Sequence, residues 1–350
     1  MDYEFLNVLW FILIAILWTG YLVLEGFDFG VGMLLPILGK KEKERRLIIN
    51  TIGPLWDGNE VWLLTAGGAT FAAFPEWYAS MFSGFYIPLL IILISLIIRG
   101  ISFEYRSKIE SVTWKKWCDT GIIVGSWVTS VLWGVAFANL VRGVEMDANH
   151  QFTGGFFALL SPFALLGGVV TLLLFLQHGA VFLALKTDGE IRAKATALAA
   201  KFSLGSIAAA GVWAIWGQLA YGKGWTWAPV LIAAGSLVAV YLTNRKGKEG
   251  WAFVFSALAI LAAVVFIFGS LFPNVMPASN NADYSLTIMN ASSTPYTLKV
   301  MSWVAVFLVP VILGYQAWTI WVFRKRIKVE HIPEPIGLES LSVPKGTFGA

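Results

Sequence analysis

Apolar runs of about 20 residues, separated by short charged clusters, fill most of this 350-residue chain. A run of that length is what a helix needs to cross a hydrocarbon layer of roughly 30 Å. Only 13% of the residues are charged, about half the share of a soluble domain. The pattern therefore excludes a water-soluble globule and predicts an all-α polytopic membrane protein. The net charge is +4. In a membrane protein the basic residues mark the cytoplasmic side, so this charge does not indicate a nucleic-acid partner.

The runs predict nine transmembrane helices in one domain, 1–326, followed by a cytoplasmic tail, 327–350. We expect two four-helix bundles, made by spans one to four and five to eight, with the ninth helix peripheral. The first and fifth runs are longer than a membrane needs, so they should tilt, bend or protrude. The polar, glycine-containing stretch 25–30 interrupts the first run. The predicted spans are 5–38, 54–73, 78–99, 117–141, 156–185, 197–221, 227–243, 250–272 and 300–323.

Lysine and arginine are distributed unevenly over the predicted connections. Of the 25 such residues, 22 follow spans one, three, five and seven or lie in the tail, Arg99 among them. The opposite side has Arg142, Lys223 and Lys299. Because basic residues stay in the cytoplasm, we predict an external N-terminus and a cytoplasmic C-terminus. The acidic start of the chain indicates a retained first helix, because a signal peptide begins with a basic region.

Four carboxylates lie within the first two predicted spans: Glu25, Asp28, Asp57 and Glu60. An acid at this depth is costly unless it is paired or hydrated. Each pair has i, i+3 spacing and shares a helix face. At about 1.5 Å per residue, all four fall in the cytoplasmic half, so two adjacent helices would gather them near the side that supplies protons. Asp57 also follows Pro54, as at the start of a helix, where the helix dipole favours a carboxylate. A role in proton handling and a role in capping the helix therefore both stay open for Asp57.

The tract Trp56-Asp57-Gly58-Asn59-Glu60-Val61-Trp62 surrounds two of these acids with an amide and two indoles. Asn59 is a polar group at membrane depth and needs a partner from another helix or from water. Tryptophans usually mark the membrane interfaces. Composition alone therefore assigns no role to Trp56 or Trp62.

Ligands for a redox cofactor are scarce in this chain. Its single cysteine, Cys118, excludes an internal disulfide and a cysteine-rich metal site. His150 falls in an outer loop and His331 in the tail, so only His178 lies within a span. Haem iron takes His, Met, Cys or Tyr ligands, often two on facing helices. We therefore predict that this chain binds no haem and no metal.

Several stretches, taken in order, resemble subunit II of the cytochrome bd-type quinol oxidases. The resemblance covers about residues 5–323, and the tryptophan–aspartate tract is its most specific part. The matching stretches are Gly26-Phe27-Asp28-Phe29-Gly30-Val31-Gly32-Met33, Trp56-Asp57-Gly58-Asn59-Glu60-Val61-Trp62, Thr65-Ala66-Gly67-Gly68-Ala69, Phe82-Ser83-Gly84-Phe85-Tyr86, Glu104-Tyr105-Arg106-Ser107-Lys108-Ile109-Glu110, Gly134-Val135-Ala136-Phe137, Trp251-Ala252-Phe253-Val254-Phe255, Phe272-Pro273 and Met276-Pro277.

The resemblance implies a haem-free subunit of the prokaryotic cell membrane that pairs with a subunit I. That partner would bind b- and d-type haems and the quinol. The pair would oxidise quinol, reduce dioxygen to water and take protons from the cytoplasm through a route entering at Asp57. Trp62 matches a position associated with an oxygen route in some members. The residues that we predict for the proton route are Asp57, Glu60, Glu25, Asp28, Trp56 and Asn59.

Two other functions fit the same residues. A proton-coupled secondary transporter also uses broken helices and intramembrane acids, although near the midplane. A structural assembly subunit would use its acids only to cap helices. The sequence does not choose between ubiquinol and menaquinol, and it leaves open a small single-helix subunit and a bound lipid or quinone.

Overall fold

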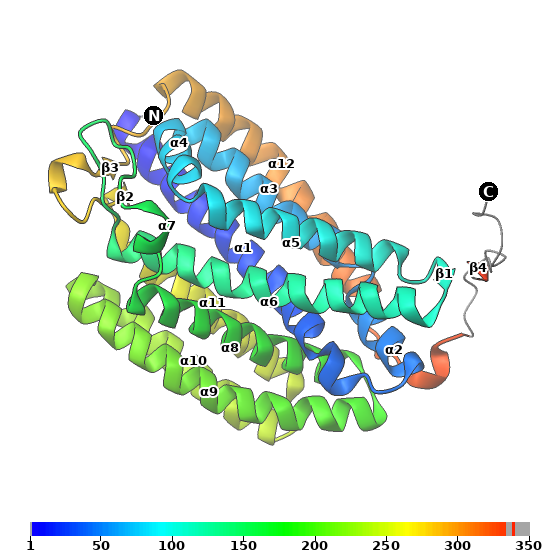
Figure 1. Cartoon of the computed structure of the whole chain (residues 1–350). Coiled ribbons are helices and arrows are strands. Elements are labelled where there is room, and N and C mark those ends of the chain that lie inside the picture. Colours follow the sequence, from blue (N-terminus) through cyan, green and yellow to red (C-terminus); the bar gives the residue numbers. More distant parts are fainter. Residues whose placement is uncertain (1, 334–337, 340–350) are drawn as a thin grey trace, which may run out of the picture.

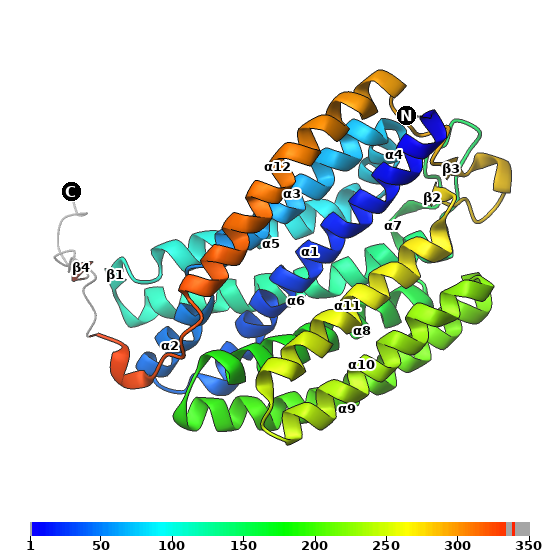
Figure 2. The ribbon, with the colours of Figure 1, turned by 180° about the vertical axis from the view of Figure 1, so that it is seen from behind.

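A computed structural model describes residues 2–333 and 338–339, whose long helices form one elongated bundle (Figures 1 and 2). Eight helices of the described part are long and apolar enough to span a membrane. Helix α3 is outside this set because polar residues in its first turns lower its mean hydropathy. The helices are α1 (Tyr3–Leu38), α2 (Glu42–Ile52), α3 (Trp56–Ala73), α4 (Pro75–Gly84), α5 (Tyr86–Tyr105), α6 (Val112–Arg142), α7 (Gly155–Ala158), α8 (Pro162–Lys186), α9 (Gly189–Tyr221), α10 (Trp227–Arg245), α11 (Glu249–Leu271) and α12 (Pro295–Val322).

The two ends of the bundle differ. One end, called here the basic end, carries α2, the turns α5–α6, α8–α9 and α10–α11, and the segment 323–333 (Figure 1, right). The other, called here the loop end, carries the N-terminus and the connections 143–161 and 272–294. The short strands β2 (Asn274–Met276) and β3 (Leu286–Thr287) pair antiparallel at the loop end. At the basic end, β1 (Ile109–Glu110) pairs in parallel with β4 (Leu338–Glu339).

Helix α1 runs through the middle of the bundle and packs on α3, α6, α8 and α11 (Figure 2). The predicted interruption at 25–30 is wrong, because α1 is one continuous helix of 36 residues. Its glycines serve close packing instead. A Cβ on Gly30 would lie 2.0 Å from the Phe175 carbonyl oxygen and 2.7 Å from the Gly179 Cα atom. The backbones of α1 and α8 therefore touch, as small residues allow in membrane helices.

Two predicted spans are divided or shortened. The third, 78–99, consists of α4 and α5, which meet at Phe85. Pro88 explains the break, because it has no N–H to donate to the carbonyl of Gly84 in the preceding turn. The fifth, 156–185, begins only at Pro162, where the hydroxyl of Ser161 accepts from the Ala164 N–H at 3.2 Å. Proline is favoured at this first helical position.

Other boundaries differ from the prediction in one direction. Helix α6 begins at Val112 rather than 117, and α9 begins at Gly189, about two turns before 197. Basic residues assigned to connections, such as Lys194, are therefore helical. Helix α2 was not predicted at all. It buries Leu47 and Ile48 against the bundle. With 11 residues it is too short to resemble a transmembrane span, although its apolar residues follow a helical period.

Helix α12 lies on the outside of the bundle, and only Leu298 and Ser302 of its residues are buried. It packs lightly on α1 and α3. After α12 the chain crosses the basic end, where the Ile327 N–H donates to the Lys186 carbonyl at 2.9 Å. Of the predicted tail, 334–337 and 340–350 lie outside the described residues.

Candidate functional site

Two acids and an arginine are buried where α1 meets α5. Glu25 and Asp28 of α1 and Arg99 of α5 all have a relative exposure of 0%. The Arg99 Nη1 donates to Glu25 Oε2 at 3.0 Å. The guanidinium lies 4.7 Å from the ring centroid of Phe29 and 5.0 Å from that of Phe103. Arg99 thus meets an acid at one edge and two aromatic faces, which attract a cation.

Asn59 connects three helices at the same level. Its Nδ2 donates to Asp28 Oδ2 at 2.7 Å, and its Oδ1 accepts from the Nε2 of Gln316 on α12 at 2.9 Å. The expectation that Asn59 finds a partner in another helix therefore agrees with its geometry. The amide holds α3 between the central helix and the peripheral one, with its donor side directed at a carboxylate.

The structure does not gather all four acids. Asp57 is exposed in the first turn of α3 at the basic end, and Glu60 is half-buried one turn further along. No hydrogen bond or ion pair within the described residues joins Asp57 to another side chain. Trp56 packs against Phe103, with ring centroids 5.3 Å apart. Only Glu25, Asp28 and Asn59 of the predicted set thus belong to the buried group.

Trp62 lies elsewhere, on a groove of about 1010 Å³ between α1, α11 and α12. Its ring packs directly on Gly20, where an added Cβ would come within 2.2 Å of it. The groove is lined almost entirely by apolar side chains, with Thr19 and Gln316 as its polar exceptions. Trp62 is therefore part of an apolar surface that connects to the buried acids through Gln316 and Asn59.

Sequence reasoning missed Arg99 and Gln316. Arg99 was counted among the cations of a connection, whereas it lies deep in α5 and is fully buried. The signal that could have found it is charge balance, because buried carboxylates require a buried cation or a proton. Gln316 had no such signal. One polar residue in an apolar run does not indicate which helix it faces.

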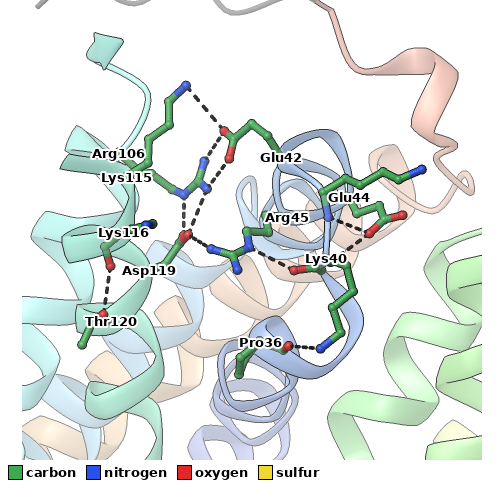
Figure 3. A network of polar contacts seen from close by, with 12 residues as sticks. Pro36, Lys40, Glu42, Glu44, Arg45, Arg106, Lys115, Lys116, Asp119 and Thr120 are labelled. Atoms are coloured by element: carbon green, nitrogen blue, oxygen red, sulfur yellow. Dashed lines mark hydrogen bonds and ion pairs between the residues drawn. The ribbon is translucent and has the colours of Figure 1, made fainter. Parts of the chain in front are cut away.

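A second charged network lies at the basic end and joins α2, α5 and α6 (Figure 3). The Arg106 side chain donates Nε to Asp119 Oδ1 at 2.6 Å and contacts Glu42 with Nη1 and Nη2, both at 2.9 Å. Arg45 donates to Asp119 Oδ2 at 2.7 Å. Lys115 lies 3.6 Å from Glu42. Each acid of this network therefore faces two cations.

The network shifts the pKa values of its members. Partial burial would raise the pKa of Glu42, but the hydrogen bonds and charge of Arg106, with the charge of Lys115, hold it below its ordinary value. Burial alone would lower the pKa of Arg106, and the carboxylates of Glu42 and Asp119 outweigh burial and raise it. Both shifts favour the charged forms of Glu42 and Arg106, and the network is a set of ion pairs.

Comparison with known proteins assigns the chain to a family. The family described as cytochrome bd terminal oxidase subunit II matches residues 6–323. The chain belongs to this family. The family predicted from the sequence is thereby confirmed. The tryptophan–aspartate tract and the glycines of α1 lie within the matched range.

The relatives of this chain are similar to it over nearly their whole length. Cytochrome bd-I ubiquinol oxidase subunit 2 of Escherichia coli (strain K12) is 42% identical, covering 95% of this chain and 98% of the relative. Cytochrome bd ubiquinol oxidase subunit 2 of Bacillus subtilis (strain 168) is 43% identical, covering 92% and 97%. A chain in the structure of bd oxidase from Geobacillus thermodenitrificans has a TM-score of 0.72 at 19% identity, covering 91% and 98%. The last likeness shows a shared fold.

The histidines of this chain are hydrogen-bonded within the protein. His178 is fully buried, with Nδ1 at 2.8 Å from the Ser256 hydroxyl and Nε2 at 3.0 Å from the Val23 carbonyl oxygen. Both ring nitrogens are thus occupied, and the ring stacks on Phe253. His150 Nδ1 lies 2.7 Å from the Tyr284 carbonyl oxygen. Within the described ranges no three His, Cys, Asp or Glu side chains form a metal-binding group.

Proposed function

We propose that this chain is the haem-free subunit II of a cytochrome bd-type quinol:oxygen oxidoreductase. It supports a subunit I that carries the b- and d-type haems and oxidises the quinol. It also supplies a route for protons from the cytoplasm to the site where dioxygen is reduced to water. The names of the Escherichia coli and Bacillus subtilis relatives, both ubiquinol oxidase subunits, support this assignment.

The observation that carries the proton route is the buried pair of carboxylates on α1. Glu25 and Asp28 are enclosed by protein, where ionisable groups are rare and usually functional. Asp57 lies at the basic end in the first turn of α3, and Glu60 follows one turn deeper. In the proposed route Asp57 receives the proton, Glu60 passes it inward, and Asn59 orients Asp28. Trp56 shields the entrance, and Trp62 borders an apolar route suited to oxygen.

A partner subunit is supported by the outer face of α3 and α12. Large apolar side chains there are mostly exposed: Leu64 is 74% exposed, Phe307 67% and Val311 68%. Such a face needs lipid or another membrane helix against it. We assign it to subunit I. A small single-helix subunit and membrane lipid complete the proposed surroundings of the chain.

The proposed topology has nine spans, with α4 and α5 together forming one and α3 included. It keeps two groups of four helices, joined through α1, with α12 peripheral. The basic end is cytoplasmic, and the N-terminus is outside, because the basic residues gather at one end. Reporter fusions after Lys248 should read cytoplasmic and fusions within 280–290 external. A reversed reading at both positions would contradict the topology.

A structural assembly role is the second candidate, and one observation favours it. Asp57 occupies the first turn of α3, where the helix dipole stabilises a carboxylate. In that case the residue helps α3 to fold and moves no proton. The proton-coupled transporter suggested by the sequence gains no support, because the family match is to an oxidase subunit.

The experiment replaces Asp57 by asparagine in the assembled complex. Asp57→Asn keeps the shape of the side chain but removes the titrating group. Quinol-driven oxygen consumption per haem should fall severalfold while the haem spectrum stays normal. Glu60→Gln should cost less, because members of the family that the sequence resembles can have glutamine at this position. Asp283→Asn, at an exposed acid of the loop end, is the matched control.

The two candidate functions predict different outcomes for this variant. If Asp57 only caps a helix, fewer complexes should assemble or their melting temperature should drop, but turnover per assembled haem should equal that of the wild type. Unchanged turnover per haem in Asp57→Asn would therefore reject the proton route and leave the assembly role.

A further inference from the structure

The buried group at Glu25, Asp28 and Arg99 has an unequal number of charges. It contains two carboxyl groups and one guanidinium, all three with 0% relative exposure. If both acids were ionised, the group would carry one uncompensated negative charge inside the protein. Burying such a charge is strongly unfavourable, and a buried acid usually takes up a proton instead.

Charged groups on the neighbouring helices do not restore the balance. Helix α3 adds Glu60 and the exposed Asp57, which are further acids. On α8, the fully buried His178 is already bonded to Ser256 and Val23. The next charge along α6 is Asp119, about 9 Å along the helix from Gly125, which faces Arg99. Tyr21 of α1 accepts from the Trp133 Nε1 at 3.0 Å.

The remaining neighbours contribute polar but uncharged groups. At this level α12 supplies Gln316, whose amide is bound to Asn59. The acids of the basic end, Glu42 and Asp119, are paired with Arg45, Arg106 and Lys115. Among the described residues, Arg99 is thus the one cation paired with this group, through its contact with Glu25.

Several polar atoms of the buried group lack a hydrogen-bond partner, and a proton on one of its carboxyl groups would supply a missing donor. Glu25 Oε1 and Asp28 Oδ1 are buried without a hydrogen-bond partner, and so are Nε and Nη2 of Arg99. Buried polar atoms normally have a partner. A carboxyl proton supplies a donor where two acceptor oxygens lack one. The Ser126 hydroxyl, packed against Gly32 of α1, is also unpartnered.

We propose that Glu25 and Asp28 together hold one exchangeable proton at rest, and that the single charge of Arg99 sets this number. Arg99 is then a positioning residue, which keeps one acid ionised and the other protonated. The inference rests on the proposed function and deepens it, because it gives the cytoplasmic proton route a proton store: the two acids, which hold one proton at rest. The store accepts or releases a proton without leaving a net charge of more than one in the interior.

The test counts protonated carboxyl groups by infrared spectroscopy of the whole complex. Wild-type-minus-variant spectra, normalised to haem content, are recorded above the amide region, where protonated carboxyl groups absorb. The band should shift in deuterated buffer, because the proton is exchangeable. Asp28→Asn and Glu25→Gln should each remove the absorbance of one carboxyl group, since the acid left behind pairs with Arg99. The double variant should also remove only one.

Each alternative gives a different count. No loss in either single variant would mean that both acids are ionised, and a loss of two in the double variant that both are protonated. Either result overturns the proposal. Arg99→Gln should add one protonated group, and Asp283→Asn should change nothing. The count does not depend on turnover, so a failure of the proton store is distinguishable from a failure of the Asp57 route.

Discussion

Two arginines of neighbouring sequence, Arg99 and Arg106, are used in opposite ways. Arg106 directs all three of its guanidinium nitrogens at carboxylate oxygens of Glu42 and Asp119 at the basic end (Figure 3). Arg99 directs one nitrogen at Glu25 and leaves the other two without a partner. The first arrangement is saturated and ties helices together. The second leaves Nε and Nη2 of Arg99 free to form further hydrogen bonds, which a proton relay requires and a purely structural pair does not.

The surroundings of the two arginines explain the difference. At the basic end each acid meets two cations, and the partly exposed pairs of Glu42 contribute a modest stabilisation. In the bundle interior the dielectric is low and both partners lose their hydration. A well-satisfied network is the better structural solution at that depth. The unsatisfied atoms around Arg99 therefore point to a function rather than to stability.

The largest expected effect follows from removing the buried cation. Arg99→Gln removes the cation of the buried pair, so the acid that it kept ionised must take up a proton, and breaking a buried pair from one side costs about 3–5 kcal/mol. We expect most of the assembled complex to be lost, measured as haem content after purification and as melting temperature. Arg245→Gln, at an exposed arginine, should assemble normally.

The double variant Glu25→Gln/Arg99→Gln sharpens this comparison. It removes both charges of the pair and should recover much of the assembly lost in Arg99→Gln, because residues in direct contact are not additive. If the double variant were worse than Arg99→Gln alone, the two residues would not act as a pair. The contrast between the interior group and the surface network would then lose its basis.

A smaller effect is expected at the surface network. Glu42→Gln removes an ion pair whose acid is 38% exposed, and such pairs contribute about 0.2–1 kcal/mol. The depressed pKa of Glu42 determines the pH dependence. Its contribution is present above the ordinary glutamate pKa and disappears as the pH falls through the lower folded value.

The measurement is the melting temperature of wild type and Glu42→Gln from about pH 7 to about pH 3. The wild type should be slightly more stable at neutral pH, and the difference should shrink on acidification and in high salt. A difference that stayed constant down to the lowest pH would show that Glu42 acts through packing and not through its charge.

The central prediction from the sequence, a helical membrane protein of this family, rested on strong local signals. The pairing of the buried acids could not be predicted in the same way. The predicted third span ended at residue 99, which left Arg99 at a membrane surface. Helix α5 instead continues to Tyr105, so Arg99 lies about 9 Å inside its basic end. This extension beyond the predicted end places an apparent loop cation within the helix, as the partner of Glu25.

The stretch around Gly26 and Gly30 is a second place where the sequence could not predict the tertiary contacts. Glycines beside two acids in a long apolar run predict a break, although small residues in such runs also suit close helix packing, and the sequence alone does not decide between the two. The structure uses them for contact with Phe175 and Gly179 of α8. Whether a glycine bends a helix or admits a neighbour depends on the neighbour, which lies far away in the chain.

The sequence by itself determined the long helices, the uneven distribution of basic residues and the presence of acids at membrane depth. Each follows from a local requirement, since a chain in lipid must satisfy its backbone hydrogen bonds within the helix. Only the tertiary structure decided that Glu25 meets Arg99, that Asn59 joins Asp28 to Gln316, and that Asp57 stays exposed. A helical period defines a face, but the partner of that face is selected by the packing of whole helices, in which a shift of one turn moves a side chain by about 5.4 Å.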